Sequence, residues 1–217
     1  MRGLGPLSLM WTLAALLMIA GAAHSAPAFE VEVETAGRKA IALAKQLHLS
    51  GRLEFLQVLG LRDLLAGDIP ASKAAFQRMI DHDPEHDEGY LQMATVAESE
   101  GDPAEAARLY TEALARQPDL AAFYLKRRGG VLFEAQRWDL ALKDAEAGLE
   151  ASPRDPDLLR LRAKCLIHSG DFARAAASYN ASLTYGRRAR TGEDDWLCGK
   201  LASRGFAAKG CGESGPR

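Results

Sequence analysis

Residues 87–118, DEGYLQMATVAESEGDPAEAARLYTEALARQP, decide the fold of this chain. They contain two apolar stripes whose members are three or four residues apart, as one face of a helix requires. The stripes consist of Tyr90, Met93, Ala94 and Ala97, and of Ala106, Tyr110, Ala113 and Leu114. Gly101 ends the first stripe and Pro118 ends the second, because proline cannot continue a helix. The stretch therefore predicts two helices joined by a tight turn.

The same unit recurs along the chain as a Gly-Asp pair followed about 16 residues later by a proline. The pairs are Gly67-Asp68, Gly101-Asp102 and Gly170-Asp171. The prolines are Pro84, Pro118 and Pro153, with spacings of 34 and 35 residues. In the fourth copy Arg187 stands at the place of the proline. A period of this length indicates a stack of repeated helical hairpins.

This pattern of large and small residues resembles the tetratricopeptide repeat. That family places a large residue, Leu-Gly and an aromatic on its first helix, and Ala, an aromatic, Ala and Pro on its second. The resemblance extends over 51–187 and implies an all-α solenoid of four repeats. The expected repeats are 51–86, 87–119, 120–154 and 155–187, with capping helices in 29–50 and 188–217 that cover the terminal apolar faces.

Residues 1–28 have the layout of a signal peptide. Arg2 precedes the uncharged run 7–20, and small residues suit cleavage after Ala28 or, alternatively, after Ser25. An uncleaved inner-membrane anchor is the other interpretation, but the run is shorter than the roughly 20 residues that a spanning helix needs. We therefore expect a periplasmic or secreted protein with no membrane span after signal cleavage.

Export raises the question of cysteine pairing, because disulfides persist in oxidising compartments. The sequence contains Cys165, Cys198 and Cys211. Cys198 and Cys211 flank the end of the expected C-terminal helix and form a disulfide candidate, although sequence alone does not fix connectivity. Cys165 lies inside a repeat helix, where we expect a small core residue.

Charge and motifs argue against several functional classes. The 27 Lys and Arg and 29 Asp and Glu give a net charge of -2, which provides no general attraction to nucleic acid. His82 and His86 lie among carboxylates, but Pro84 between them prevents a shared helical face, so we expect no metal site. No phosphate-binding loop, dinucleotide fingerprint or nucleophilic triad is recognisable. We expect no cofactor and no enzymatic activity. The alternative is an enzyme whose site is assembled across the concave groove of the helical stack.

In the family that the chain resembles, the first helices line a concave groove, so their exposed residues are the candidates for binding a partner. The candidates are Leu91, Thr95, Lys126, Arg127, Phe133, Arg160, Lys164 and Ile167. Their cations make the C-terminal half of the groove basic. These residues predict a protein or peptide partner, and an acidic one if charge determines which partner binds.

Lys126, Arg160 and Lys164 resemble a basic set with which some family members bind a terminal carboxylate. The asparagines that accompany this set are replaced by Thr95 and Gly130. A solvated charged face whose aliphatic stems cover apolar surface is the alternative. We expect an interaction scaffold or adaptor in the bacterial cell envelope, in the company of assembly factors or co-chaperones.

Overall fold

The computed structural model describes residues 53–186, 191–206, 208 and 211. Over these residues the chain forms nine α-helices and one short 3-10 helix, with no strand, which confirms the all-α prediction. None of these helices combines the length and the apolar character needed to cross a membrane. The expected signal segment and N-terminal capping helix lie outside the described residues.

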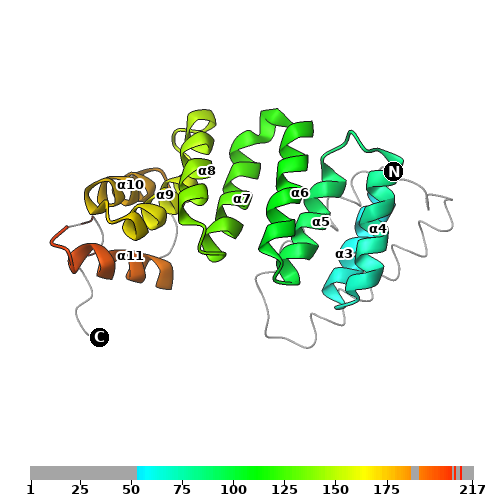
Figure 1. Ribbon diagram of the computed structural model, residues 1–217, viewed down its shortest axis with the longest axis horizontal. Helices are drawn as coiled ribbons and strands as arrows, with labels where there is room; N and C mark the ends of the chain where they lie inside the picture. The colour runs from blue at the N-terminus through cyan, green and yellow to red at the C-terminus, as the bar shows by residue number, and fades with distance from the viewer. Residues whose placement is uncertain (1–52, 187–190, 207, 209–210, 212–217) are drawn as a thin grey trace, which may run out of the picture. The chain divides into compact units, whose positions relative to one another are not determined.

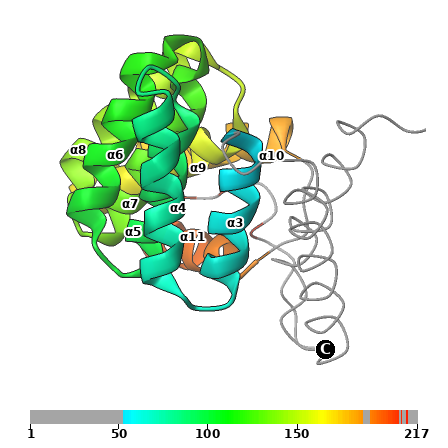
Figure 2. The ribbon, with the colours of Figure 1, turned by 90° about the vertical axis from the view of Figure 1, so that its right-hand side faces the viewer.

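The chain divides between His82 and Asp83 into two compact units. The first unit contains the helical hairpin of α3 (Leu53–Leu65) and α4 (Ile69–His82). The helices of the second unit are α5 (Glu88–Ser99), α6 (Pro103–Arg116), α7 (Ala121–Glu134), α8 (Trp138–Ala151), α9 (Pro156–Ser169), α10 (Phe172–Tyr185) and α11 (Gly192–Ala202), with η1 (Pro118–Leu120) before α7. Within this unit each α-helix packs against the next along the chain (Figures 1 and 2).

The four helical hairpins of the described residues each turn at a residue with positive φ, which is glycine in three of them. Gly67, Gly101 and Gly170 have φ values of 75°, 72° and 82°, which glycine adopts without steric cost. The aspartate that follows caps the second helix: the carboxylate of Asp102 accepts a hydrogen bond from the backbone N–H of Glu105 at 3.0 Å. The recurring Gly-Asp pair is therefore a helix stop followed by a helix start.

The turn between α7 and α8 lacks both residues of this pair. Gln136 has a φ of 60°, which costs a residue with a Cβ about 1 kcal/mol. Arg137 precedes α8 and makes no side-chain capping bond. The hairpin nevertheless forms, because tertiary packing of the two helices outweighs the unfavourable turn.

Buried tyrosines packed among small residues form the core of the second unit. Tyr110, Tyr124 and Tyr179 have exposed fractions of 0%, 1% and 2%. Small residues let the helices approach: a Cβ on Gly129 would lie 2.8 Å from Cδ2 of Leu161. Burial of each large apolar side chain contributes about 1.5–3 kcal/mol.

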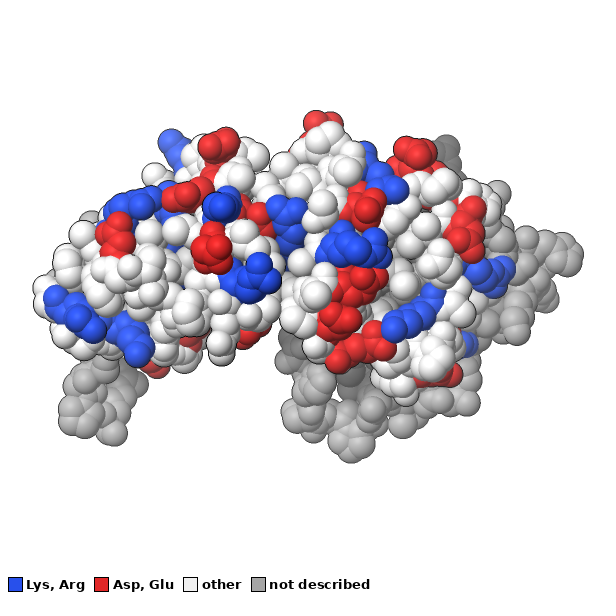
Figure 3. Space-filling view, viewed as in Figure 1, with Lys and Arg blue, Asp and Glu red and all other residues white. Residues whose placement is uncertain are grey.

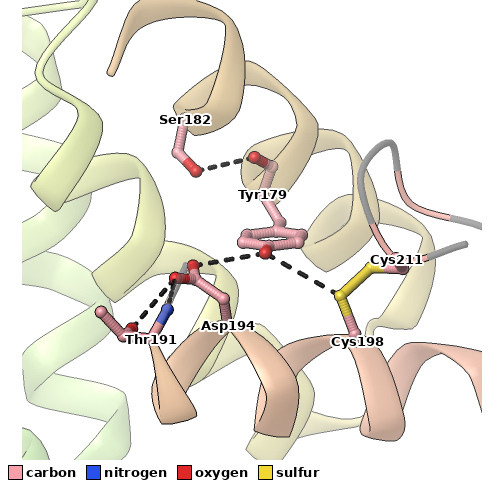
Figure 4. Close-up of a disulfide and its surroundings, with 6 residues drawn as sticks. All are labelled: Tyr179, Ser182, Thr191, Asp194, Cys198 and Cys211. Atoms are coloured by element: carbon pink, nitrogen blue, oxygen red, sulfur yellow. Dashed lines mark hydrogen bonds between the residues drawn. A yellow bond between two sulfur atoms is a disulfide. The ribbon is translucent and has the colours of Figure 1, made fainter. Parts of the chain in front are cut away.

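Helix α11 has no following helix within the described residues and is held in another way. Its Leu197 and Leu201 are fully buried against α9 and α10. A disulfide joins its Cys198 to Cys211, with Cα atoms 5.4 Å apart (Figure 4). Cys211, which follows α11 in the sequence, is thereby tied back to the helix.

A buried polar group fixes the start of the same helix. The hydroxyl of Tyr179 in α10 donates to Asp194 at 3.2 Å and lies 3.9 Å from Sγ of Cys198 (Figure 4). Asp194 also accepts from the backbone N–H of Thr191 at 2.9 Å. Because this carboxylate is only 3% exposed, these donors offset the cost of its burial.

The remaining cysteine, Cys165, is free and buried in α9, which confirms its prediction as a core residue. Burial raises the pKa of its thiol to about 12. The reactive thiolate is therefore scarce at neutral pH.

Candidate partner-binding face

The first helices of the second unit, α5, α7, α9 and α11, lie along one side of it, which we call the first-helix face. Helix α7 contacts α9, and α9 contacts α11, without an intervening second helix. Polar contacts also connect α5 to α7. The face is thus continuous over three junctions between neighbouring first helices.

The junction between α5 and α7 is closed by a hydrogen-bonded triad. Arg127 donates to Glu98 at 3.0 Å and to the hydroxyl of Tyr110 at 2.9 Å. The same hydroxyl donates to Glu98 at 2.6 Å. Burial, followed by the bond to Glu98, raises the pKa of Tyr110 well above its usual value. The phenol therefore stays protonated and keeps donating to the carboxylate.

Lysines make the corresponding contacts at the next two junctions. Nζ of Lys126 in α7 lies 3.0 Å from the carboxylate of Asp155, the N-cap of α9. Nζ of Lys164 in α9 lies 2.9 Å from Glu193 in α11. Exposed pairs of this kind each contribute about 0–1 kcal/mol. Together with Arg127, these cations form a ladder of ion pairs between neighbouring first helices.

Arg160 and Ile167 lie in the interior, so the expectation that they are exposed is wrong. Their exposed fractions are 4% and 7%. Nη2 of Arg160 donates to Asp157 at 2.6 Å, whereas Nη1 has no hydrogen-bond partner within the described ranges. Helix α9 packs against α7, α8, α10 and α11, which leaves little of its surface free. Helical spacing indicates a shared face but not how deeply neighbouring helices cover it.

The ion pairs also correct the expectation that the C-terminal half of the face is basic. Lys126, Lys164 and Arg160 each lie beside a carboxylate. Those carboxylates come from the start of α9 and from α11, outside the residues that the repeat pattern assigns to the groove. On the side of the molecule seen in Figure 3, basic and acidic side chains are likewise interspersed. Charge on this face is therefore largely balanced.

The two predicted face residues on α5 have uncharged side chains. Leu91 is partly buried against the core of its own repeat. The hydroxyl of Thr95 donates to the backbone carbonyl of Leu91 at 3.1 Å. Both side chains remain partly exposed, so they are available for contact with a partner.

The junction of α7, α9 and α11 differs, because it holds an aromatic pocket of about 290 Å³. Its lining consists of Phe133, Lys164, His168, Glu193 and Trp196. The imidazole of His168 stacks on Trp138, with ring centroids 4.0 Å apart and planes inclined by 17°. The ring of Trp196 lies 5.8 Å from the same imidazole, at 23°. His168 thus contacts two indoles while remaining exposed.

Two lysines lie beside rings of the aromatic pocket, and one of them, Lys164, is paired with the pocket carboxylate of Glu193. Nζ of Lys164 lies 4.2 Å from the ring centroid of Phe133, and Nζ of Lys200 lies 5.9 Å from that of Trp196. Burial is the largest cause of the lowered pKa of His168, and the charges of Lys200 and Lys164 lower it further. The imidazole is therefore neutral at neutral pH.

Of the pocket residues, the repeat pattern predicted Phe133 and Lys164 but missed His168, Trp196 and Glu193. A signal for His168 was present, because it follows Lys164 by four residues and so shares its helical face. No comparable signal identifies Trp196 and Glu193, since their position depends on how α11 packs against α9.

A second hollow, of about 460 Å³, lies among α6, α7 and α8. Arg128 reaches it but donates to both carboxylate oxygens of Asp144, at 2.8 and 2.6 Å. This guanidinium is committed to an internal pair. Across the described part of the chain, no group of three or more His, Cys, Asp and Glu residues is placed to hold a metal ion.

Solved structures share this fold. PilW, described as a widely conserved type IV pilus biogenesis factor, has a TM-score of 0.63 at 16% identity, over 90% of this chain and 85% of that chain. The pilF protein of Pseudomonas aeruginosa has a TM-score of 0.61 at 21% identity, over 70% of this chain and 68% of that chain. YrrB, described as a TPR protein with an unusual peptide-binding site, has a TM-score of 0.55 at 13% identity, over 93% of each chain. At such identities the similarity shows the fold alone.

No curated protein matches the sequence significantly. The sequence model of the tetratricopeptide repeat matches residues 58–121, 91–134 and 127–193. These overlapping matches extend over more than half of the 217 residues. Helical hairpins stacked in tandem, with Gly-Asp turns and tyrosines packed among alanines, agree with that match. The chain belongs to the tetratricopeptide-repeat family.

Proposed function

We propose that this protein is an interaction scaffold of the bacterial cell envelope that binds a protein or peptide on its first-helix face. The observation that carries the proposal is the aromatic pocket, where rings from α7, α9 and α11 meet at a surface beside two ammonium groups. Aromatic side chains that remain accessible in a pocket are typical of protein-binding surfaces.

The ion-pair ladder supports a rigid binding surface. Arg127, Lys126 and Lys164 each connect one first helix to the next and so fix the spacing of the face before a partner arrives. A surface that is already ordered loses less conformational entropy on binding. In this proposal the predicted cations position the helices, and Leu91, Thr95 and Phe133 supply contacts to the partner.

Three titratable groups with strongly raised pKa values support a non-catalytic role, and His168 is a perturbed group that lies in the aromatic pocket. Burial is the leading cause of the raised pKa values of Tyr110, Tyr124 and Cys165. All three side chains lie in the cores of the repeats. A catalytic site would instead collect perturbed acids, bases or nucleophiles in an accessible cleft.

The proposed location rests on residues 1–28, whose layout is that of a cleaved export signal. Cell fractionation and N-terminal sequencing of the purified protein test this location. A mature chain that starts after Ala28 or Ser25 and fractionates with the periplasm supports release. An intact N-terminus in the membrane fraction supports the alternative, an anchored assembly factor or co-chaperone.

Site-specific photocrosslinking in the native host tests the binding face. A photoreactive phenylalanine analogue replaces Thr95 or Phe133 on first helices, and Ala115 or Ala147 on second helices serves as the matched control, since both alanines are exposed. We expect a partner to crosslink through the first-helix positions and not through the controls. Crosslinks from the second helices alone would place the binding surface elsewhere.

A further inference from the structure

The aromatic pocket shows which chemistry a partner needs, provided that the proposed function holds and a partner does bind the first-helix face. Three of its rings come from three different first helices: Phe133 from α7, His168 from α9 and Trp196 from α11. None of the three is fully buried. The pocket therefore presents ring surface to a ligand instead of enclosing it in a core.

Lys200 disfavours a cationic ligand beside Trp196, whereas the charge of Lys164 is balanced by Glu193. Lys164 lies over the ring of Phe133, and Lys200 lies near that of Trp196. An arginine or lysine from a partner would compete with these ammonium groups for the same ring faces and would be repelled by Lys200. A neutral aromatic ring meets no such repulsion and can pack against the indole of Trp196.

The two lysines differ in whether their ammonium groups are already paired with a carboxylate. Lys164 is paired with Glu193 at 2.9 Å. Lys200 is exposed, and within the described part of the chain it has no carboxylate partner; its contact is with the ring of Trp196. An ammonium group beside an accessible ring complements a carboxylate that accompanies an aromatic side chain.

We propose that the aromatic pocket binds an aromatic side chain of the partner that has an aspartate or glutamate next to it. The ring packs against Trp196, and the carboxylate pairs with Lys200. Ring stacking supplies the attraction, while the charge selects acidic aromatic segments over basic ones.

Intrinsic fluorescence gives a direct test. The chain has three tryptophans, and in a Trp11→Phe background the emission comes from Trp138 and Trp196 alone. The probes are acetylated and amidated twelve-residue peptides with a central Glu-Phe-Glu, Lys-Phe-Lys or Glu-Ala-Glu, none containing tryptophan. We expect the Glu-Phe-Glu peptide to change the emission and to bind about tenfold more tightly than the other two. Equal binding of Glu-Phe-Glu and Glu-Ala-Glu would overturn the proposal.

A charge reversal separates the pocket from general electrostatics. Lys200→Glu should abolish the preference for Glu-Phe-Glu over Lys-Phe-Lys. Lys143→Glu, at an exposed position of α8 outside the aromatic pocket, is the matched control and should keep it. Equal effects of the two variants would also overturn the proposal. Far-UV circular dichroism establishes that both variants are folded.

The outcomes distinguish this inference from the proposed function. If photocrosslinking through Thr95 and Phe133 captures a partner but the Glu-Phe-Glu peptide leaves the fluorescence unchanged, the scaffold stands and the ligand chemistry is wrong. If the first-helix positions capture nothing in the native host, both proposals fail.

Discussion

Helices α9 and α11 are both first helices, but they are completed in different ways. Helix α9 turns at Gly170-Asp171 into α10, and the two pack as a hairpin. Helix α11 is followed by Gly205, which also has a positive φ, of 79°, and then by a segment that the Cys198–Cys211 disulfide ties back. Within the described residues, a covalent link thus stands after α11 where a second helix packs after α9.

Removing the disulfide is the strongest way to break this comparison. The double variant Cys198→Ser, Cys211→Ser should lower the free energy of unfolding of α11 by about 3 kcal/mol, because the link closes a short loop in the unfolded chain. Amide hydrogen exchange should show faster exchange in α11 but not in α9. A thiol reductant on the unmodified protein should have the same effect, and unchanged protection of α11 after either treatment would contradict this account.

The N-caps of the two helices give a smaller contrast. Asp155 accepts from the backbone N–H groups of Asp157 and Leu158 at 2.8 and 3.0 Å and also pairs with Lys126. Asp155→Ala should therefore destabilise the protein by about 2 kcal/mol, whereas Thr191→Ala before α11, which removes the hydroxyl that donates to Asp194 at 3.0 Å, should cost about 1 kcal/mol. Urea denaturation measures both values. A larger loss of stability for Thr191→Ala than for Asp155→Ala would contradict this ranking of the two N-caps.

The turns that follow the first helices extend the comparison. Both α9 and α11 are followed by a glycine with positive φ, whereas α7 is followed by Gln136. Gln136→Gly should raise the free energy of unfolding by about 0.5–1 kcal/mol, because glycine adopts this conformation without steric cost. Gly170→Ala is the opposite control and should lower it by a similar amount. Thermal unfolding that moves both variants in one direction would contradict this assignment.

The smallest expected effect concerns pH at the contact between α9 and α11. The pKa of His168 is lower in the folded protein than in the unfolded chain, so the unfolded state takes up a proton first as the pH falls. The free energy of unfolding should therefore decrease as the pH drops below about 6.5, which is the pKa of histidine in the unfolded chain, toward the lower pKa of His168 in the folded protein. Between pH 7.5 and 5.5 the Tm of the unmodified protein should fall more than that of His168→Gln. Identical pH profiles would show that His168 does not contribute.

The repeat architecture was predictable because its determinants are local. Gly101-Asp102 stops one helix and starts the next through backbone geometry and a single capping bond. Pro118 ends the following helix for an equally local reason. These signals predicted the all-α fold and the family before any contact between repeats was known.

The partner-binding face was less predictable, because it depends on packing between repeats. Helical spacing placed Arg160 and Ile167 on the face, but neighbouring helices bury both side chains. The carboxylate of Glu193, which balances Lys164, comes from a helix 29 residues further along the chain. Burial and pairing of this kind are properties of the assembled helices, so periodicity alone does not reveal them.

The disulfide that helps to hold α11 also connects the aromatic pocket to the redox state of the chain. Trp196 and Glu193 belong to the helix that Cys198 ties to Cys211. In the reducing cytosol we expect the thiols to remain separate and this helix to be less firmly held. If the chain is exported as proposed, it would acquire the complete pocket only after oxidation.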